Sequence, residues 1–159
     1  KRIMAGMPYY VNANCKKDNG GNAFSLETLA NDVEELAYNG VDPSRLLLVA
    51  GRGVLSSINN IKASFVQETM KIRELDFNVK SIVVPGENTV KLAPLCTAVN
   101  PNEYYLYDKE SVQLKFLRAL DKEDLAKTGD SDRKMVVTEA VLECHNWAQG
   151  GAIRRTNIA

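Results

Sequence analysis

Residues 25–50 form the stretch SLETLANDVEELAYNGVDPSRLLLVA, which decides the class of fold. Its first part predicts an α-helix, because apolar residues recur at helical spacing over residues 26–37. Ser25 is a typical N-cap, whose hydroxyl can accept a hydrogen bond from a free N–H group of the first turn. Gly40 can adopt the left-handed conformation that ends many helices. We therefore expect an amphipathic helix that ends just before Gly40.

The second part of the stretch, Leu46–Ala50, is a continuous apolar run, which favours a strand covered on both faces. Gly51-Arg52-Gly53 follows, and the apolar spacing of residues 54–63 predicts a second helix. From Phe65 to Val84 the apolar residues fall into short β-like pieces. The sequence therefore mixes helices with strands, and the predicted fold class is α+β.

The C-terminal third contains two longer β-like segments. Residues 112–116 alternate apolar and polar side chains, and residues 135–145 predict a long strand. Between them, residues 121–132 are charged and predict an exposed connection with a turn at residues 127–130. Residues 150–155 predict a flexible end that is first apolar and then basic.

The charge of the chain is balanced, with 20 Lys and Arg against 20 Asp and Glu. This balance disfavours a protein whose main task is to bind nucleic acid, because phosphate neutralisation needs a surplus of cations. The sequence has no apolar run near the roughly 20 residues of a membrane helix. Its three cysteines and one histidine have no metal-binding spacing, so we expect free thiols, no metal and no cofactor.

A nucleotide-binding enzyme is the alternative that the sequence leaves open. Gly51-Arg52-Gly53 lies between a predicted strand and a predicted helix, as a dinucleotide-binding motif would, but the third glycine is replaced by Ser56. A tight turn is the favoured interpretation of these glycines. No nucleophile, base and oxyanion site come together in the sequence, so we expect no catalytic residue and no enzyme.

Several segments carry a family resemblance, and they are residues 2–7, 39–43, 105–108, 112–118, 125–132 and 139–153. In this order they resemble the C-terminal half of the major capsid proteins of tailed bacteriophages, which adopt the Hong Kong 97-type fold. The resemblance is most specific at Leu125-Ala126-Lys127-Thr128-Gly129-Asp130-Ser131-Asp132. Members of that family carry an upstream arm, an extended loop and a long spine helix. The resemblance therefore implies that the chain is part of a longer protein, which agrees with a first residue that is Lys rather than Met.

The same resemblance implies a division of the chain. Residues 1–103 would form an axial-domain-like α/β region. Residues 104–148 would form a peripheral-domain-like β segment with a charged loop. Residues 149–159 would return to the axial domain and end in a C-terminal tail.

The implied function is structural. The protein would be the major head subunit of a tailed phage or prophage and would assemble into hexamers and pentamers of an icosahedral shell around double-stranded DNA. Its partners would be copies of itself, with portal and scaffold proteins as further candidates. We expect no membrane contact and no sequence-specific binding of nucleic acid. Synthesis in the cytoplasm of the bacterial host would precede incorporation into the virion capsid.

Candidate subunit contacts lie in the charged connection, because charges of both signs can pair across a subunit boundary. They are Lys122, Glu123, Asp124, Lys127, Asp130, Asp132 and Arg133. Tyr104 and Tyr105 are the apolar candidates, and they can equally pack inward as ordinary strand residues.

Overall fold

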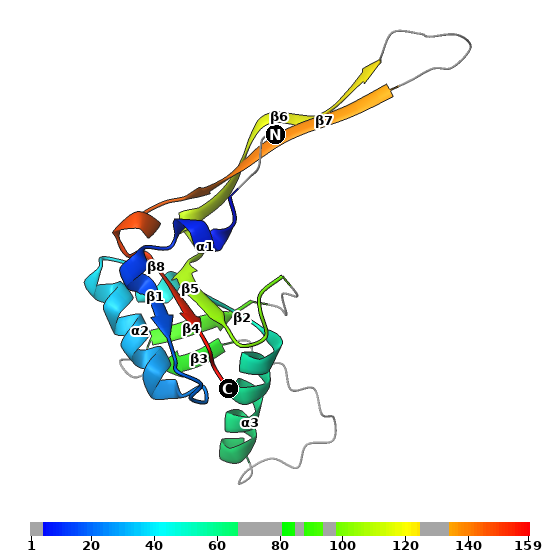
Figure 1. The fold of residues 1–159 in the computed structure, drawn as a ribbon. Coiled ribbons are helices and arrows are strands. Elements are labelled where there is room, and N and C mark those ends of the chain that lie inside the picture. Colours follow the sequence, from blue (N-terminus) through cyan, green and yellow to red (C-terminus); the bar gives the residue numbers. More distant parts are fainter. Residues whose placement is uncertain (1–4, 67–80, 85–87, 94–97, 125–133) are drawn as a thin grey trace.

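A computed structural model describes residues 5–66, 81–84, 88–93, 98–124 and 134–159 of the 159-residue chain. Figure 1 shows a body of helices and strands from which a long two-stranded ribbon projects. The predicted mixture of helices and strands is confirmed.

The body is built on a six-stranded sheet in the order β1-β8-β5-β2-β4-β3. Its strands are β1 (Lys16–Asp18), β2 (Leu46–Ala50), β3 (Ser81–Val84), β4 (Asn88–Leu92), β5 (Tyr104–Asp108) and β8 (Ala152–Thr156). Strand β2 pairs in parallel with β4 and antiparallel with β5. Strand β8 pairs antiparallel with β5 and in parallel with β1. The apolar run Leu46–Ala50 therefore lies in the interior of the sheet, as its composition predicted.

Helix α2 (Leu26–Tyr38) has the ends that the sequence predicted. The hydroxyl of Ser25 accepts a hydrogen bond from the N–H of Thr28 at 3.1 Å. At the other end Gly40 has a φ of +82°, and its N–H donates to the carbonyl of Ala37 at 3.0 Å. The N–H of Val41 donates to the carbonyl of Leu36 at the same distance, which completes a Schellman motif.

The other two helices differ in length. Helix α1 (Met7–Tyr10) is a single turn near the base of the ribbon (Figure 1). Helix α3 (Arg52–Val66) is longer than the predicted helix at both ends. Phe65 therefore belongs to a helix, and the expectation of a β-like piece at this residue is wrong.

The ribbon consists of β6 (Val112–Asp124) and β7 (Lys134–Cys144), which pair antiparallel. The 3₁₀ turns Lys109–Ser111 and Trp147–Gln149 connect it to the body. The connection that we expected to begin at residue 121 begins later, because β6 continues in strand conformation to Asp124. A two-stranded ribbon has solvent on both faces, so its strands can carry charged residues.

One further expectation changes with the topology. Strand β8 is an interior strand of the body rather than a flexible end, because β1 and β5 pair with its two edges. The strand Tyr104–Asp108 also belongs to the six-stranded sheet. The start of a peripheral-like segment at residue 104 stays a prediction. The change from the large sheet to the ribbon falls at Lys109–Ser111.

The core of the body lies between the sheet and its helices. Buried apolar side chains come from α2, α3 and the sheet, and the largest fully buried ones are Trp147, Tyr104, Leu29, Leu36, Leu46, Leu48, Leu106, Ile153 and Ile158.

Candidate functional site

The glycine turn between β2 and α3 packs against a neighbouring backbone segment. The N–H of Gly51 donates to the carbonyl of Glu103 at 2.9 Å. The N–H groups of Gly53 and Val54 both donate to the carbonyl of Pro101, at 3.0 and 3.3 Å. A phosphate bound at the start of a helix would need these same N–H groups. The geometry supports the tight-turn interpretation and gives the nucleotide-binding alternative no support.

Replacement of Gly51 by alanine is expected to lower the free energy of unfolding by about 3 kcal/mol, because it forces a clash in a packed region. The new Cβ would lie 1.9 Å from the carbonyl oxygen of Asn100 and 2.8 Å from that of Pro101, and neither backbone atom can move easily. Urea unfolding followed by the fluorescence of Trp147, the single tryptophan, measures the loss. Gly6→Ala is the matched control, since its Cβ meets nothing closer than 3.5 Å. A Gly51→Ala protein as stable as this control would contradict the close approach.

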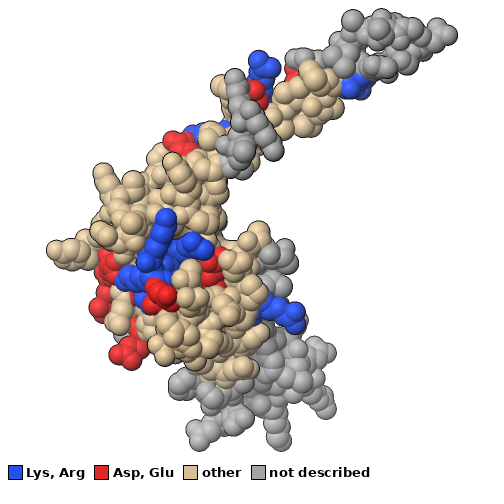
Figure 2. All heavy atoms as spheres, viewed as in Figure 1, with Lys and Arg blue, Asp and Glu red and all other residues tan. Residues whose placement is uncertain are grey.

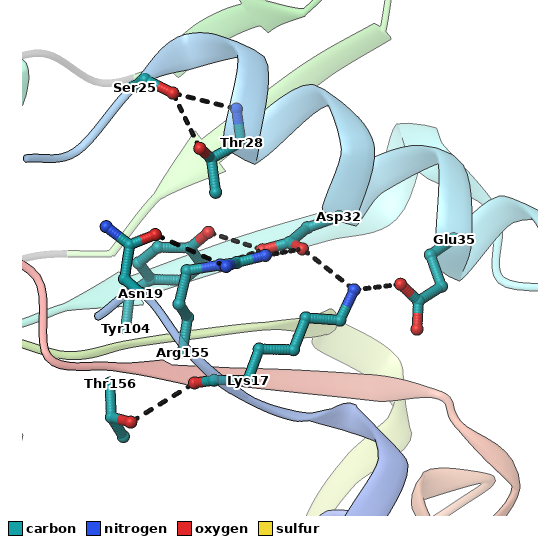
Figure 3. A network of polar contacts seen from close by, with 9 residues as sticks. All are labelled: Lys17, Asn19, Ser25, Thr28, Asp32, Glu35, Tyr104, Arg155 and Thr156. Carbon is teal, nitrogen blue, oxygen red and sulfur yellow. Dashed lines mark hydrogen bonds and ion pairs between the residues drawn. The ribbon is translucent and has the colours of Figure 1, made fainter. Parts of the chain in front are cut away.

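Asp32 of α2 is the centre of a buried ionic network (Figure 3). Its carboxylate accepts hydrogen bonds from Nε and Nη2 of Arg155, at 3.0 and 2.6 Å, and from the hydroxyl of Tyr104 at 2.6 Å. Nζ of Lys17 lies 3.4 Å from the same carboxylate and also bonds to Glu35. Elements α2, β8, β5 and β1 therefore converge on one carboxylate, whose residue is fully buried.

The protonation states of this network suit a structural role. Burial, and then the nearby Asp32, raises the pKa of Tyr104 well above its usual value, so the phenol remains a neutral donor. The hydrogen bonds that Arg155 donates to Asp32 raise the pKa of Arg155 against the opposing effect of burial. Within the described residues, every buried side-chain nitrogen and oxygen has a hydrogen-bond partner. The network stabilises the body and offers no free base or nucleophile.

A second ion pair lies on the opposite face of β8. Because successive side chains of a strand point to opposite faces, Arg154 points away from the Asp32 network. Its Nη2 and Nε lie 2.7 and 3.1 Å from Oε2 of Glu103. Its guanidinium also lies 5.7 Å from the centre of the Tyr105 ring. Strand β8 is thus held on both faces by acids that are distant in sequence.

The ribbon has one apolar face and one charged face near its base. Residues paired across the ladder share a face, and the pairs Val112–Cys144, Leu114–Leu142 and Phe116–Ala140 are all apolar. The alternate positions are mainly charged. Lys115 and Glu143 form an ion pair at 3.6 Å, and Arg118 and Glu139 form one at 3.9 Å.

Among the described residues, a group of large exposed apolar side chains lies on strand β6 of the ribbon. Phe116 is 58% exposed, although it belongs to the apolar face. Leu117 and Leu120 are 78% and 75% exposed, and they fall at the two register shifts of the ladder, between Phe116 and Arg118 and between Arg118 and Asp121. Extra residues at such bulges redirect side chains. Large exposed apolar side chains grouped on one element are typical of an interaction surface.

The base of the ribbon is fixed to the body by Trp147. This side chain is fully buried, and its ring lies 5.2 Å from that of Tyr107. Its Nε1 donates to Oγ of Ser111 at 2.8 Å. The N–H of His145 donates to the carbonyl of Ser111 at 2.7 Å. Both ends of the ribbon are therefore tied together where it leaves the body.

The candidate contact residues from the sequence fall in three places. Lys122 is exposed on β6, and Glu123 and Asp124 are the last two residues of that strand. Lys127, Asp130, Asp132 and Arg133 lie outside the described residues. Tyr104 and Tyr105 are 0% and 3% exposed, so they pack inward, which is one of the two arrangements that the sequence left open.

The sequence reasoning missed the exposed leucines of the ribbon. The alternation in residues 112–116 predicts a strand with one apolar face, but it does not say whether another element packs on that face. The bulges that expose Leu117 and Leu120 arise from pairing with β7, which no local pattern reports.

Other kinds of site find little support in the described part of the chain. It contains no group of three or more His, Cys, Asp or Glu side chains that could hold a metal ion. The described helices are all too short or too polar to cross a membrane. Cys15 is buried, and its burial raises the pKa of the thiol, which disfavours the reactive thiolate.

Comparison with known proteins gives one family. A family model described as SU10 major capsid protein matches residues 1–159. The match spans both the body and the ribbon. No curated protein matches the chain.

Proposed function

The chain belongs to the SU10 major capsid protein family, and from this membership we propose that its body and its ribbon are the axial-like and peripheral-like parts of a Hong Kong 97-type shell subunit. The protein is a structural major capsid subunit of a phage, a non-enzymatic kind of protein that assembles with copies of itself into the virion capsid. The fold type and the roles of the two parts are the proposal.

The observation that carries the proposal is the division between a packed body and a projecting ribbon (Figure 1). The body has a six-stranded sheet, a buried core and paired buried charges, so it can hold its shape without a neighbour. The ribbon has exposed apolar side chains and needs contacts outside the body. This combination suits a subunit that presents one rigid part at a symmetry axis and another part to adjacent subunits.

We draw the boundaries in this proposal where the six-stranded sheet gives way to the ribbon. The strands of the six-stranded sheet, β1–β5 and β8, would belong to the axial-like part. The paired strands β6 and β7 would belong to the peripheral-like part. Compared with the division expected from the sequence, β5 moves from the peripheral part to the axial part.

The partners follow from the same proposal. Copies of the chain would form hexamers and pentamers of an icosahedral shell around double-stranded DNA, with portal and scaffold proteins as further candidates. Figure 2 shows cationic and anionic side chains mixed on the visible face of the body, which suits contact with copies better than a grip on DNA phosphates. Synthesis in the bacterial cytoplasm and the lack of sequence-specific nucleic-acid binding belong to this proposal as well.

Expression of the full-length protein in bacteria, followed by sedimentation and negative-stain microscopy, tests the proposal. We expect capsomers or closed shells in the fast-sedimenting fraction, because a shell subunit is stable in contact with its copies. A protein that remains monomeric at every concentration and ionic strength would contradict it. Thermal-shift screening with dinucleotides and nucleoside phosphates, which should leave the melting temperature unchanged, separates this result from the enzyme alternative.

A further inference from the structure

The apolar face of the ribbon has no covering layer among the described residues. The pairs Leu114–Leu142 and Phe116–Ala140 lie on this face, and Leu114 and Phe116 are both exposed. Figure 1 shows that the ribbon stands away from the body, so the described body does not reach most of its length. In water an isolated two-stranded ribbon is marginally stable and usually needs packing on one face. A covering partner is therefore expected.

The bulges add a second reason to expect a partner. Leu117 and Leu120 lie where β6 has more residues than β7, so their backbone is displaced from the regular ladder. Two large apolar side chains occupy these exposed positions. Together with the exposed Leu114 and Phe116 they make up the exposed apolar side chains of β6, called the apolar patch here and defined as Leu114, Phe116, Leu117 and Leu120.

The charges next to this patch favour a second copy of the chain as the partner. The ribbon carries cations such as Lys115 and Arg118 and anions such as Glu139 and Glu143, and both signs are already paired within it. On the described strands of the ribbon, a strongly charged partner such as nucleic acid would find no matching surplus of charge. Another copy brings the same apolar patch and the same mixture of charges, so the two surfaces match without an unpaired charge.

We propose that the apolar patch of the ribbon docks on a second copy of this chain, and that the bulge residues Leu117 and Leu120 are its main anchors. This inference rests on the proposed function, because that function supplies the copies. Docking buries side chains that are at least half exposed in the single chain and removes them from contact with water. The patch then becomes an interior surface of the assembly.

The double substitution Leu117→Ser and Leu120→Ser tests the proposal. Sedimentation velocity over a range of concentrations should show self-association that is about a hundredfold weaker, because two exposed leucines no longer become buried. The unfolding midpoint in urea should stay close to that of the parent, since both side chains project into solvent in the single chain. Val83→Ser is the matched control: Val83 is 71% exposed but lies on β3 of the body, and its substitution should leave association unchanged.

Hydrogen exchange gives an independent measurement. Amides of residues 112–124 should exchange more slowly at concentrations where the parent associates, and those of the double variant should not. If the parent associates while its ribbon exchanges as fast as in the monomer, or if the double variant associates as tightly as the parent, the docking proposal is wrong and the capsid function stands. In these experiments the parent and its variants are the full-length protein, and a full-length parent that does not associate at all would overturn the capsid proposal itself and this inference with it.

Discussion

Substitution of Asp32 by alanine is expected to lower the free energy of unfolding by about 3–5 kcal/mol, the usual cost of removing one partner from a buried ion pair. The guanidinium of Arg155 would lose both of its carboxylate hydrogen bonds, and the hydroxyl of Tyr104 would lose its acceptor. These groups belong to β8 and β5, so the lost hydrogen bonds are those that join helix α2 to two interior strands of the sheet. Urea unfolding followed by tryptophan fluorescence measures it, because Trp147 is buried and distinguishes folded from unfolded chains.

Glu35→Gln is the control for this experiment. Glu35 also bonds to Lys17, but its side chain is partly exposed, so water can replace much of what it loses. Exposed ion pairs contribute about 0–1 kcal/mol, and the substitution should fall in that range. If Asp32→Ala is no more destabilising than Glu35→Gln, the network is not the main polar support of the body.

Trp147→Ala is expected to lower the free energy of unfolding by about 3–5 kcal/mol, because it leaves a large cavity at a fully buried position. It also removes the hydrogen bond to Ser111 and the ring contact with Tyr107. Since these contacts join the two ends of the ribbon to the body, hydrogen exchange at His145 and at the first residues of β6 should accelerate. Circular dichroism during urea unfolding measures the stability, as this variant has no tryptophan fluorescence.

Trp147→Phe separates the two parts of this effect. Phenylalanine keeps much of the apolar volume but cannot donate to Ser111, so the expected loss is smaller, about 1–3 kcal/mol for a smaller ring and one missing bond. Faster exchange at the ribbon base in both variants would identify the hydrogen bond as the anchor. An alanine variant with unchanged stability and unchanged exchange would contradict the anchoring role of Trp147.

The elements that the sequence predicted well are those whose signals are local. Helix α2 is an example, because its N-cap, its apolar stripe and the glycine after it all lie within residues 25–40. Strand β2 is another, since an uninterrupted apolar run indicates burial on both faces wherever the partners come from. In both cases the residues that shape the element are the residues of the element itself.

Strand β8 shows why other elements were not predicted. Arg154 and Arg155 made residues 150–155 resemble an exposed basic end, yet both side chains are largely buried. Their charges are paired with Glu103 and Asp32, which lie far away in the sequence. A buried charge can be recognised only when its partner is known, and the partner is set by the topology.

The contact residues suggested by the sequence stay a prediction, and they differ in kind from the apolar side chains that the structure exposes on β6. The sequence directed attention to the charges from Lys122 onward, whereas the structure exposes an apolar patch on β6 between Leu114 and Leu120. Alternation in residues 112–116 predicts a strand with one apolar face, and it does not say whether anything covers that face. Which residues become bulges depends on the register with β7, and that register is a property of the pair.

The order of strands in the body has a consequence for how the protein folds as it is synthesised. Strand β8 pairs with both β1 and β5, so the first and the last of the described strands must meet in one sheet. The sheet cannot close until residue 156 has left the ribosome, by which time the whole ribbon has already emerged. Pairings between such distant segments form slowly. During that interval the apolar patch and the unpaired edges of the sheet are exposed to water. We therefore expect neighbouring nascent chains to aggregate unless the sheet forms rapidly or a chaperone covers these surfaces.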